Sequence, residues 1–230
     1  MTSQTTPQRH YDLLIFDWDG TLMDSAGQIV AAMQRAIQDA GLPERSPEQL
    51  RDLIGLGLND VVGRLFPHID PQRVRSWLSA YRRRYFSPAS RAQLFAGTQQ
   101  ALDQLLAQGY ELAVATGKGR RGLDEALAHS GIGGRFACTR CADESAPKPA
   151  PDMVDDVLLR TATLAERALV IGDTTYDMGM ARAAGVDAIG VACGVHDAGR
   201  LHAGGARTVL TSVAALPDWL AQQNCVGVTD

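Results

Sequence analysis

Residues 13–21 read Leu-Leu-Ile-Phe-Asp-Trp-Asp-Gly-Thr, and the prediction of the fold starts from them. The four apolar residues predict a buried β-strand that ends as Asp17 and Asp19 begin. Successive side chains of a strand point to opposite faces, so both carboxylates can reach one centre only if the strand unwinds after Asp17. Gly20 would permit the sharp turn that follows. The pattern favours chemistry with one carboxylate as nucleophile and a second as proton donor, although a surface turn rich in Asp and Gly is the alternative.

Length and composition describe an ordinary core-forming protein. The chain has 230 residues, of which 45% are hydrophobic and 21% charged, so it can form one large domain or a domain with an insertion. The net charge of −4 gives no reason to expect nucleic acid or an anionic membrane as a partner. No apolar run approaches the roughly 20 residues that span a bilayer, and residues 1–10 lack a signal-peptide core. The four cysteines are too few and irregular for a disulfide framework, and Cys138 and Cys141 are interpreted as ordinary thiols. We therefore expect a cytoplasmic protein.

The segment 24–87 reads as helix after helix, without a convincing strand. Four helices are predicted: one capped by Asp24 and ended by Gly41, one opened by the capping-box pattern at 46–49, one over 58–66, and one that begins at Asp70-Pro71. A block of this kind, placed directly after the first strand, is typical of a second, smaller domain inserted into the first.

From residue 97 onward, helices alternate with short apolar strands. Helices are predicted at 98–108, 120–130, 151–161 and 177–184, and strands at 112–115, near Phe136 (weakly), at 168–171, 188–191 and 208–210, before a last helix. Such alternation implies a parallel sheet with helices on both faces. The predicted fold class is α/β: a parallel, Rossmann-like sheet core with an inserted small all-helical domain. We assign residues 1–23 and 88–230 to the core and residues 24–87 to the helical domain.

Further polar residues fall at predicted strand ends, where sites form in open parallel sheets. They are Thr116 with Gly117 and Lys118, Lys148 between two prolines, and Asp173 and Asp177 after the strand 168–171. Each has an ordinary explanation by itself: Thr116 as a turn residue, Lys148 as a solvated side chain, Asp173 as a helix cap. Together with Asp17 and Asp19 they would place four carboxylates in one crevice. A lysine and a divalent cation would relieve their repulsion, and hard oxygen ligands favour Mg²⁺.

With these residues the chain resembles the haloacid dehalogenase superfamily, in its phosphatase branch, and within it the phosphoglycolate phosphatases. Four motifs carry the resemblance: Asp17-x-Asp19-Gly20-Thr21, Thr116, Lys148, and Gly172-Asp173-x-x-x-Asp177. The helical segment then occupies the position of that family's cap, with Ile54-Gly55-Leu56-Gly57-Leu58 as a supporting match. The chain departs from the family pattern at two places. It has Thr-Gly-Lys at 116–118, where Thr-Asn-Lys is commoner, and Phe-Ala-Gly-Thr at 95–98 in place of the usual Pro-Gly-Val version.

The resemblance implies a role for each matching residue. Asp17 attacks phosphorus and becomes an aspartyl phosphate, while Asp19 protonates the leaving alkoxide and then activates water. Thr116, Gly117 and Lys148 bind the phosphoryl group. Mg²⁺ would be held by Asp17, the backbone carbonyl of Asp19, and Asp173, with Asp177 acting through water or by holding Lys148. The implied substrate is a small phosphorylated metabolite, 2-phosphoglycolate as the best candidate, bound by a monomer or a homodimer.

Other interpretations stay open at this point. A phosphomutase acting on a sugar phosphate would share all four motifs. A signalling domain phosphorylated on Asp would group similar residues, but its acceptor follows a later strand and it should lack Asp19. Two further features have no assigned role: Arg82-Arg83-Arg84 is interpreted as a solvated helix face, and His196 could reach the cleft or lie in a surface loop.

Overall fold

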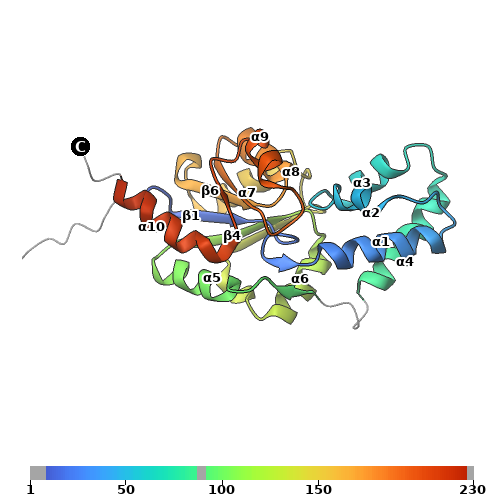
Figure 1. Ribbon diagram of the computed structural model, residues 1–230, viewed down its shortest axis with the longest axis horizontal. Helices are drawn as coiled ribbons and strands as arrows, with labels where there is room; N and C mark the ends of the chain where they lie inside the picture. Colours follow the sequence, from blue (N-terminus) through green and yellow to red (C-terminus); the bar gives the residue numbers. More distant parts are fainter. Residues whose placement is uncertain (1–8, 87–91, 227–230) are drawn as a thin grey trace, which may run out of the picture.

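The computed structural model describes residues 9–86 and 92–226, and its centre is a parallel sheet (Figure 1). Six strands form this sheet in the order β5-β4-β1-β6-β7-β8. Their bounds are β1 Leu13–Phe16, β4 Glu111–Thr116, β5 Cys138–Cys141, β6 Ala168–Gly172, β7 Asp187–Val191 and β8 Val209–Leu210. Because β1 lies between β4 and β6, the residues that follow these three strands meet at the same edge of the sheet.

Helices cover both faces of the sheet, as Figure 1 shows. On one face lie α5 Thr98–Ala107, α6 Arg120–Ser130 and α10 Leu216–Val226, and on the other α7 Asp152–Thr161, α8 Thr175–Ala183 and α9 Ala198–Gly204. The alternation of side chains along β1 separates the two layers. Leu14 and Phe16 pack in the cluster that contains Leu102 of α5, whereas Leu13 and Ile15 pack in the cluster of α7 and α8. The α/β prediction is confirmed.

Within the described residues 25–86 the chain forms a helical unit with an apolar core of its own, which we call the cap. Its helices are α1 Ala26–Asp39, α2 Pro47–Arg51, α3 Leu58–Leu65 and α4 Pro71–Tyr85. Trp77 is fully buried in this core, among residues that include Met33, Leu50 and Phe66. A short antiparallel pair, β2 Met23–Asp24 with β3 Gln93–Leu94, lies where the chain enters and leaves the cap. We retain the division into core and cap at 24–87 as a proposal.

Local sequence signals placed most cap helices correctly. Ser46 and Gln49 form the predicted reciprocal capping box at α2, and the Asp70 carboxylate accepts a hydrogen bond from the Gln72 amide at the start of α4. Asp24, however, does not cap α1: it belongs to β2, and Ser25 precedes the helix without a side-chain cap bond. Pairing with β3 holds Asp24 extended, so tertiary contacts override the local preference.

Three details of the core differ from the prediction. The strand expected near Phe136 lies two residues later, because residues 133–135 form a 3₁₀ turn before β5. Helix α8 begins at Thr175, since Thr174 and Asp177 bond reciprocally as a capping box. Helix α9 was not predicted from the sequence. No described helix is long and apolar enough to cross a membrane.

Candidate active site

A buried lysine holds two of the predicted carboxylates together. Lys148 Nζ lies 2.6 Å from Asp17 Oδ1 and 2.6 Å from Asp177 Oδ1, and all three side chains are at most 1% exposed. Asp177 Oδ2 accepts hydrogen bonds from the amide and hydroxyl of Thr174. Asp177 is therefore fixed from both sides, and it positions Lys148 against Asp17.

Asp173 completes this group from the end of β6. Its Oδ1 accepts a 2.7 Å hydrogen bond from the Thr21 hydroxyl, and its Oδ2 accepts one of 2.9 Å from the Val195 amide. Carboxylate oxygens of Asp17, Asp173 and Asp177 all lie within 4.8 Å of one another. We call this group, with Lys148, the floor of the site.

The floor carries more negative charge than its one lysine can balance. Burial raises the pKa of Asp17 to about 7, although the Lys148 ammonium lowers it. Burial and the neighbouring carboxylates also raise the pKa of Asp173 above its ordinary value. Asp17 Oδ2 is buried and has no hydrogen-bond partner among the described residues. An unpartnered oxygen within an oxygen-only donor set fits a hard divalent cation.

Asp19 has different partners, although it lies only two residues from Asp17. Its Oδ1 accepts a 2.6 Å hydrogen bond from the Ser25 hydroxyl, and its Oδ2 forms a 2.8 Å ion pair with Lys118 Nζ. Gly20, with φ of 87°, makes the turn expected of it. The loop therefore separates the two carboxylates into two electrostatic environments, which suits two different chemical roles.

Thr116 and Gly117 lie at the end of β4, beside the floor. Thr116 is 1% exposed, and its Oγ1 accepts a hydrogen bond from the Lys118 amide at 3.2 Å. A Cβ on Gly117 would lie 2.3 Å from the backbone oxygen of Gly55 in the cap. Only glycine allows this approach, so the cap backbone rests directly on the core at this point.

The cap segment 55–57 contacts two further core loops. A Cβ on Gly55 would lie 3.2 Å from Thr174 Oγ1, in the loop that follows β6. A Cβ on Gly57 would lie 3.3 Å from the Cβ atoms of Ala142 and Pro147, in the loop that follows β5. The segment therefore lies across the mouth of the site.

A cavity of about 560 Å³ lies between the core and the cap, and Asp17 is the floor residue that lines it. Core residues Asp17, Asp19, Thr116, Gly117 and Lys118 line one side. The cap side is mainly apolar and aromatic, with Ile29, Met33, Leu56, Val61, Tyr81 and Tyr85. We call this cavity the site pocket.

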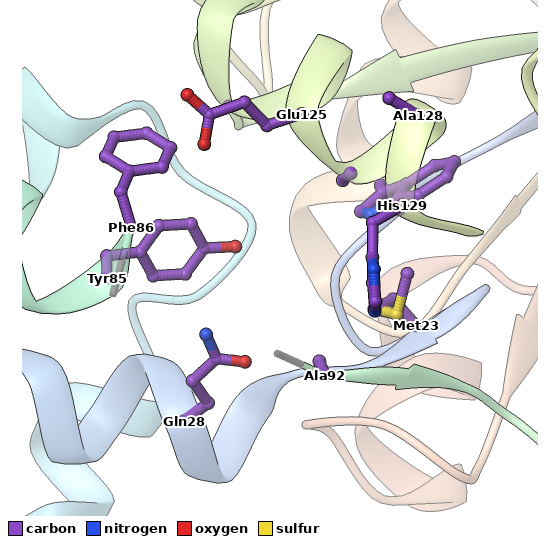
Figure 2. Close-up of a pocket in the computed structure, with 11 residues that line it drawn as sticks. Met23, Gln28, Tyr85, Phe86, Ala92, Glu125, Ala128 and His129 are labelled. Atoms are coloured by element: carbon purple, nitrogen blue, oxygen red, sulfur yellow. The ribbon is translucent and has the colours of Figure 1, made fainter. Parts of the chain in front are cut away.

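A second cavity, of about 540 Å³, adjoins the site pocket at the joint between cap and core. Figure 2 shows Tyr85 and Phe86 on one side of it and His129 of α6 on the other. Tyr85, Phe86 and Gly122 line both cavities.

The remaining sequence candidates lie in structural roles. His196 is 2% exposed; its Nδ1 accepts a hydrogen bond from the Thr175 amide, and its Nε2 lies 3.2 Å from Asp52 Oδ1. It therefore connects the loop after β7 to α8 and the cap. Arg84 pairs with Asp39 within the cap, and Arg82 lines the site pocket with an exposed side chain. Cys138, Cys141 and Cys193 are free thiols.

Sequence reasoning missed the partners of Asp19. Lys118 was visible directly after Thr116-Gly117 but received no role, and Ser25 received none. Tyr85, which accepts a hydrogen bond from Lys118, lies four residues after Tyr81 and eight after Trp77. That helical spacing was the available signal for an aromatic row on one side of α4.

Comparison with known proteins identifies the family. Residues 14–191 match the model of the haloacid dehalogenase-like hydrolases. A protein of Dickeya dadantii named probable phosphatase IndB is 35% identical over 196 residues, covering 83% of this chain and 85% of that protein. The phosphoglycolate phosphatase of Vibrio parahaemolyticus is 28% identical over 225 residues, which cover 93% of this chain and 98% of that protein. The solved structure of a haloacid dehalogenase-like hydrolase from Bacteroides fragilis matches this chain with a TM-score of 0.82 at 25% identity. The match covers 90% of this chain and 99% of that one.

The chain therefore belongs to the haloacid dehalogenase-like hydrolase family and is an enzyme. The names of its relatives group it with the phosphatases of that family, which confirms the resemblance stated from the motifs.

Proposed function

We propose that this hydrolase is a Mg²⁺-dependent phosphatase that works through an aspartyl-phosphate intermediate. The observation that supports this most directly is the separation of Asp17 from Asp19. Asp17 lies in the floor against Lys148, whereas Asp19 lies against Ser25 and Lys118. In this proposal Asp17 attacks phosphorus and Asp19 moves protons.

The residues that would hold Mg²⁺ are Asp17 and Asp173, with the backbone carbonyl of Asp19. Asp177 would act through a water molecule or by holding Lys148, and its contacts with Lys148 and Thr174 support the second of these roles. Bound there, the ion would neutralise charge on the nucleophile and the phosphoryl oxygens.

The chain's own side chains account for each bond change. Asp17 forms a bond to phosphorus as the bond from phosphorus to the ester oxygen breaks, and Asp19 gives its proton to the departing oxygen. Water then attacks the phosphoaspartate, Asp19 takes a proton from that water, and inorganic phosphate leaves with Asp17 regenerated. Thr116 donates to a phosphoryl oxygen, and Lys148 screens the charge.

For the substrate, we propose a small phosphorylated metabolite, with 2-phosphoglycolate as the best candidate. Its support is the name of relatives such as the Vibrio parahaemolyticus protein and the position of segment 55–57 across the mouth of the site. A covered pocket of this size admits a metabolite and excludes a phosphoprotein or nucleic acid. Phosphomutase action on a sugar phosphate is the alternative. The cytoplasmic location and the monomeric or homodimeric state stay predictions.

Profiling kcat/KM over glycolate, sugar, nucleotide and peptide phosphates, with Mg²⁺ and with excess chelator, tests the proposal. We expect release of inorganic phosphate, highest for 2-phosphoglycolate and lost in chelator. Isomerisation of a sugar phosphate without phosphate release would identify a mutase instead. Full activity in chelator would contradict the metal assignment, and a preference for phosphopeptide would contradict the covered pocket.

A further inference from the structure

Lys118 is a buried ammonium in the site pocket, and two of its three N–H groups have partners. Its side chain is 7% exposed. One N–H bonds Asp19 Oδ2 at 2.8 Å, and a second donates to the Tyr85 hydroxyl. The structure gives the third N–H no acceptor within residues 9–86 and 92–224. A lysine has three donors, so one remains for a ligand in the pocket.

Aromatic stacking fixes Tyr85 in the cap. Its ring stacks on Tyr81 at 5.6 Å between centroids, and Tyr81 stacks on Trp77 at 5.7 Å. Trp77 is fully buried in the core of the cap. The ammonium also lies 4.6 Å from the centre of the Tyr85 ring, a cation–π distance. Lys118 is therefore held between a core carboxylate and a rigid row of the cap.

Lys118 is placed differently from the other cations that line the pocket. Arg82 is exposed, and Arg121 pairs with Glu125 and packs over Phe86. Of these lining cations, Lys118 is the one in contact with a predicted catalytic carboxylate.

We propose that Lys118 is a specificity-determining residue whose free N–H binds an anionic group, a carboxylate, on the carbon next to the ester oxygen of the substrate. The proposal rests on the proposed function, because it assigns to Asp19 contact with that ester oxygen. Lys118 would then contact both Asp19 and the carboxylate of the substrate, as Lys148 contacts both Asp17 and Asp177.

The distances place such a carboxylate within reach. Oδ1 of Asp19 is bonded to Ser25, so we take Oδ2 as the oxygen that comes within about 3 Å of the ester oxygen to protonate it. Lys118 Nζ lies 2.8 Å from this Oδ2, so Nζ lies within about 6 Å of the ester oxygen. In 2-phosphoglycolate the carboxyl carbon is two bonds from the ester oxygen. The apolar cap side offers this group no other buried cation among the lining residues.

The test compares 2-phosphoglycolate with ethyl phosphate, which has the same two-carbon chain without the carboxylate. The wild type should prefer 2-phosphoglycolate in kcat/KM, and Lys118→Met should reduce that preference about 10- to 100-fold, the usual effect of losing a charged hydrogen bond. Arg83→Met, which removes a cation that bonds Ser79 outside the pocket, should keep the preference. An equal loss for both substrates in Lys118→Met would show that Lys118 only supports Asp19 and would overturn the proposal.

Binding separates this proposal from the proposed function. Calorimetry with Mg²⁺ on Asp17→Asn, and on the double variant with Lys118→Met, reports recognition without turnover. We expect the double variant to bind 2-phosphoglycolate about 10- to 100-fold more weakly and ethyl phosphate equally well. If each ligand binds the two variants with the same affinity, the assignment of Lys118 is overturned, even if the enzyme is a phosphatase. If the double variant shows this selective loss of binding but the wild type does not hydrolyse 2-phosphoglycolate, the assignment of Lys118 stands and the proposed function is refuted.

Tyr85→Phe gives a second route if Lys118→Met does not fold. It keeps the stacked ring and removes the hydroxyl that holds Lys118. We expect the KM for 2-phosphoglycolate to rise with little change for ethyl phosphate. A rise of the same size for both would overturn the proposal.

Discussion

The floor of the site and the cap that covers it differ in almost every physical respect. The floor consists of fully buried charges, Asp17, Lys148, Asp173 and Asp177, that follow strands or neighbour them. The cap presents apolar side chains, a glycine-containing backbone segment at 55–57, and the hydroxyl of Tyr85. In the floor, the exact placement of charge is maintained by mutual bonds. The cap contributes to the site mainly through the shape of its apolar surface and the close approach of its backbone to the core, rather than through charge.

This contrast indicates how one fold can keep the same reaction chemistry in the floor while the substrate changes through the cap. Strand ends are rigid because both faces of the sheet are packed, so charges placed there stay within bonding distance of one another. The cap has its own core and can be altered without disturbing those strands. Lys118 is where the two parts meet. Variants of each part test this division, beginning with the floor.

The largest effect is expected for Asp17→Asn. An amide cannot form the acyl phosphate, so kcat should fall at least about 10⁴-fold, as for other nucleophile replacements. The amide is nearly isosteric with the carboxylate, so the thermal midpoint should stay close to that of the wild type. Asp12→Asn is the matched control, because Asp12 pairs with Arg167 outside the site and should leave activity unchanged. Comparable turnover by a clean Asp17→Asn preparation would refute the nucleophile assignment.

Asp19→Asn should lower the rate by about 10²–10⁴-fold, the usual contribution of general acid–base catalysis. The loss should shrink for aryl phosphates, because their leaving groups need less protonation. Rates measured across leaving groups of different pKa check this. A uniform loss would exclude the acid role in the first step and leave only water activation in the second.

Gly117→Ala addresses the cap rather than the floor. Its new Cβ would meet the Gly55 backbone oxygen at 2.3 Å, so the cap segment must move away from the site. We expect kcat/KM to fall about 10- to 100-fold, because small misplacements of positioning groups are costly. Gly134→Ala, with no atom within 4 Å of the added Cβ, is the control. Wild-type activity in Gly117→Ala would show that close contact of cap and core is not required.

The smallest effect concerns pH and metal affinity. Burial raises the pKa of Asp17 to about 7, so below that pH a proton occupies the carboxyl that Mg²⁺ would need. The apparent Kd for Mg²⁺ should therefore rise as pH falls below 7, approaching tenfold per pH unit, and should level off above it. Calorimetric titrations over this range measure the trend. A Kd independent of pH would separate Asp17 from the metal site.

Prediction from the sequence succeeded where local patterns determine structure. The apolar run before Asp17 forms β1, the capping box at Ser46 opens α2, and Gly20 makes the turn. The motif residues Asp17, Lys148, Asp173 and Asp177 do come together, because strand ends in a parallel sheet share one edge. Asp24 and the strand near Phe136 were misplaced, since pairing with β3 and a 3₁₀ turn are not visible in local propensity.

The fold class, the family and the order of the floor residues could be predicted from the sequence, because periodicity, caps and motif spacing are local properties. The partner of each charge, in contrast, depends on the three-dimensional arrangement of the chain. Asp17 and Asp19 are near neighbours in the chain, yet one bonds Lys148 and the other Lys118, 131 positions and 99 positions away. Tyr85 joins Lys118 across the boundary of cap and core for the same reason. Contacts between distant segments depend on how whole layers pack, and no local pattern encodes that packing.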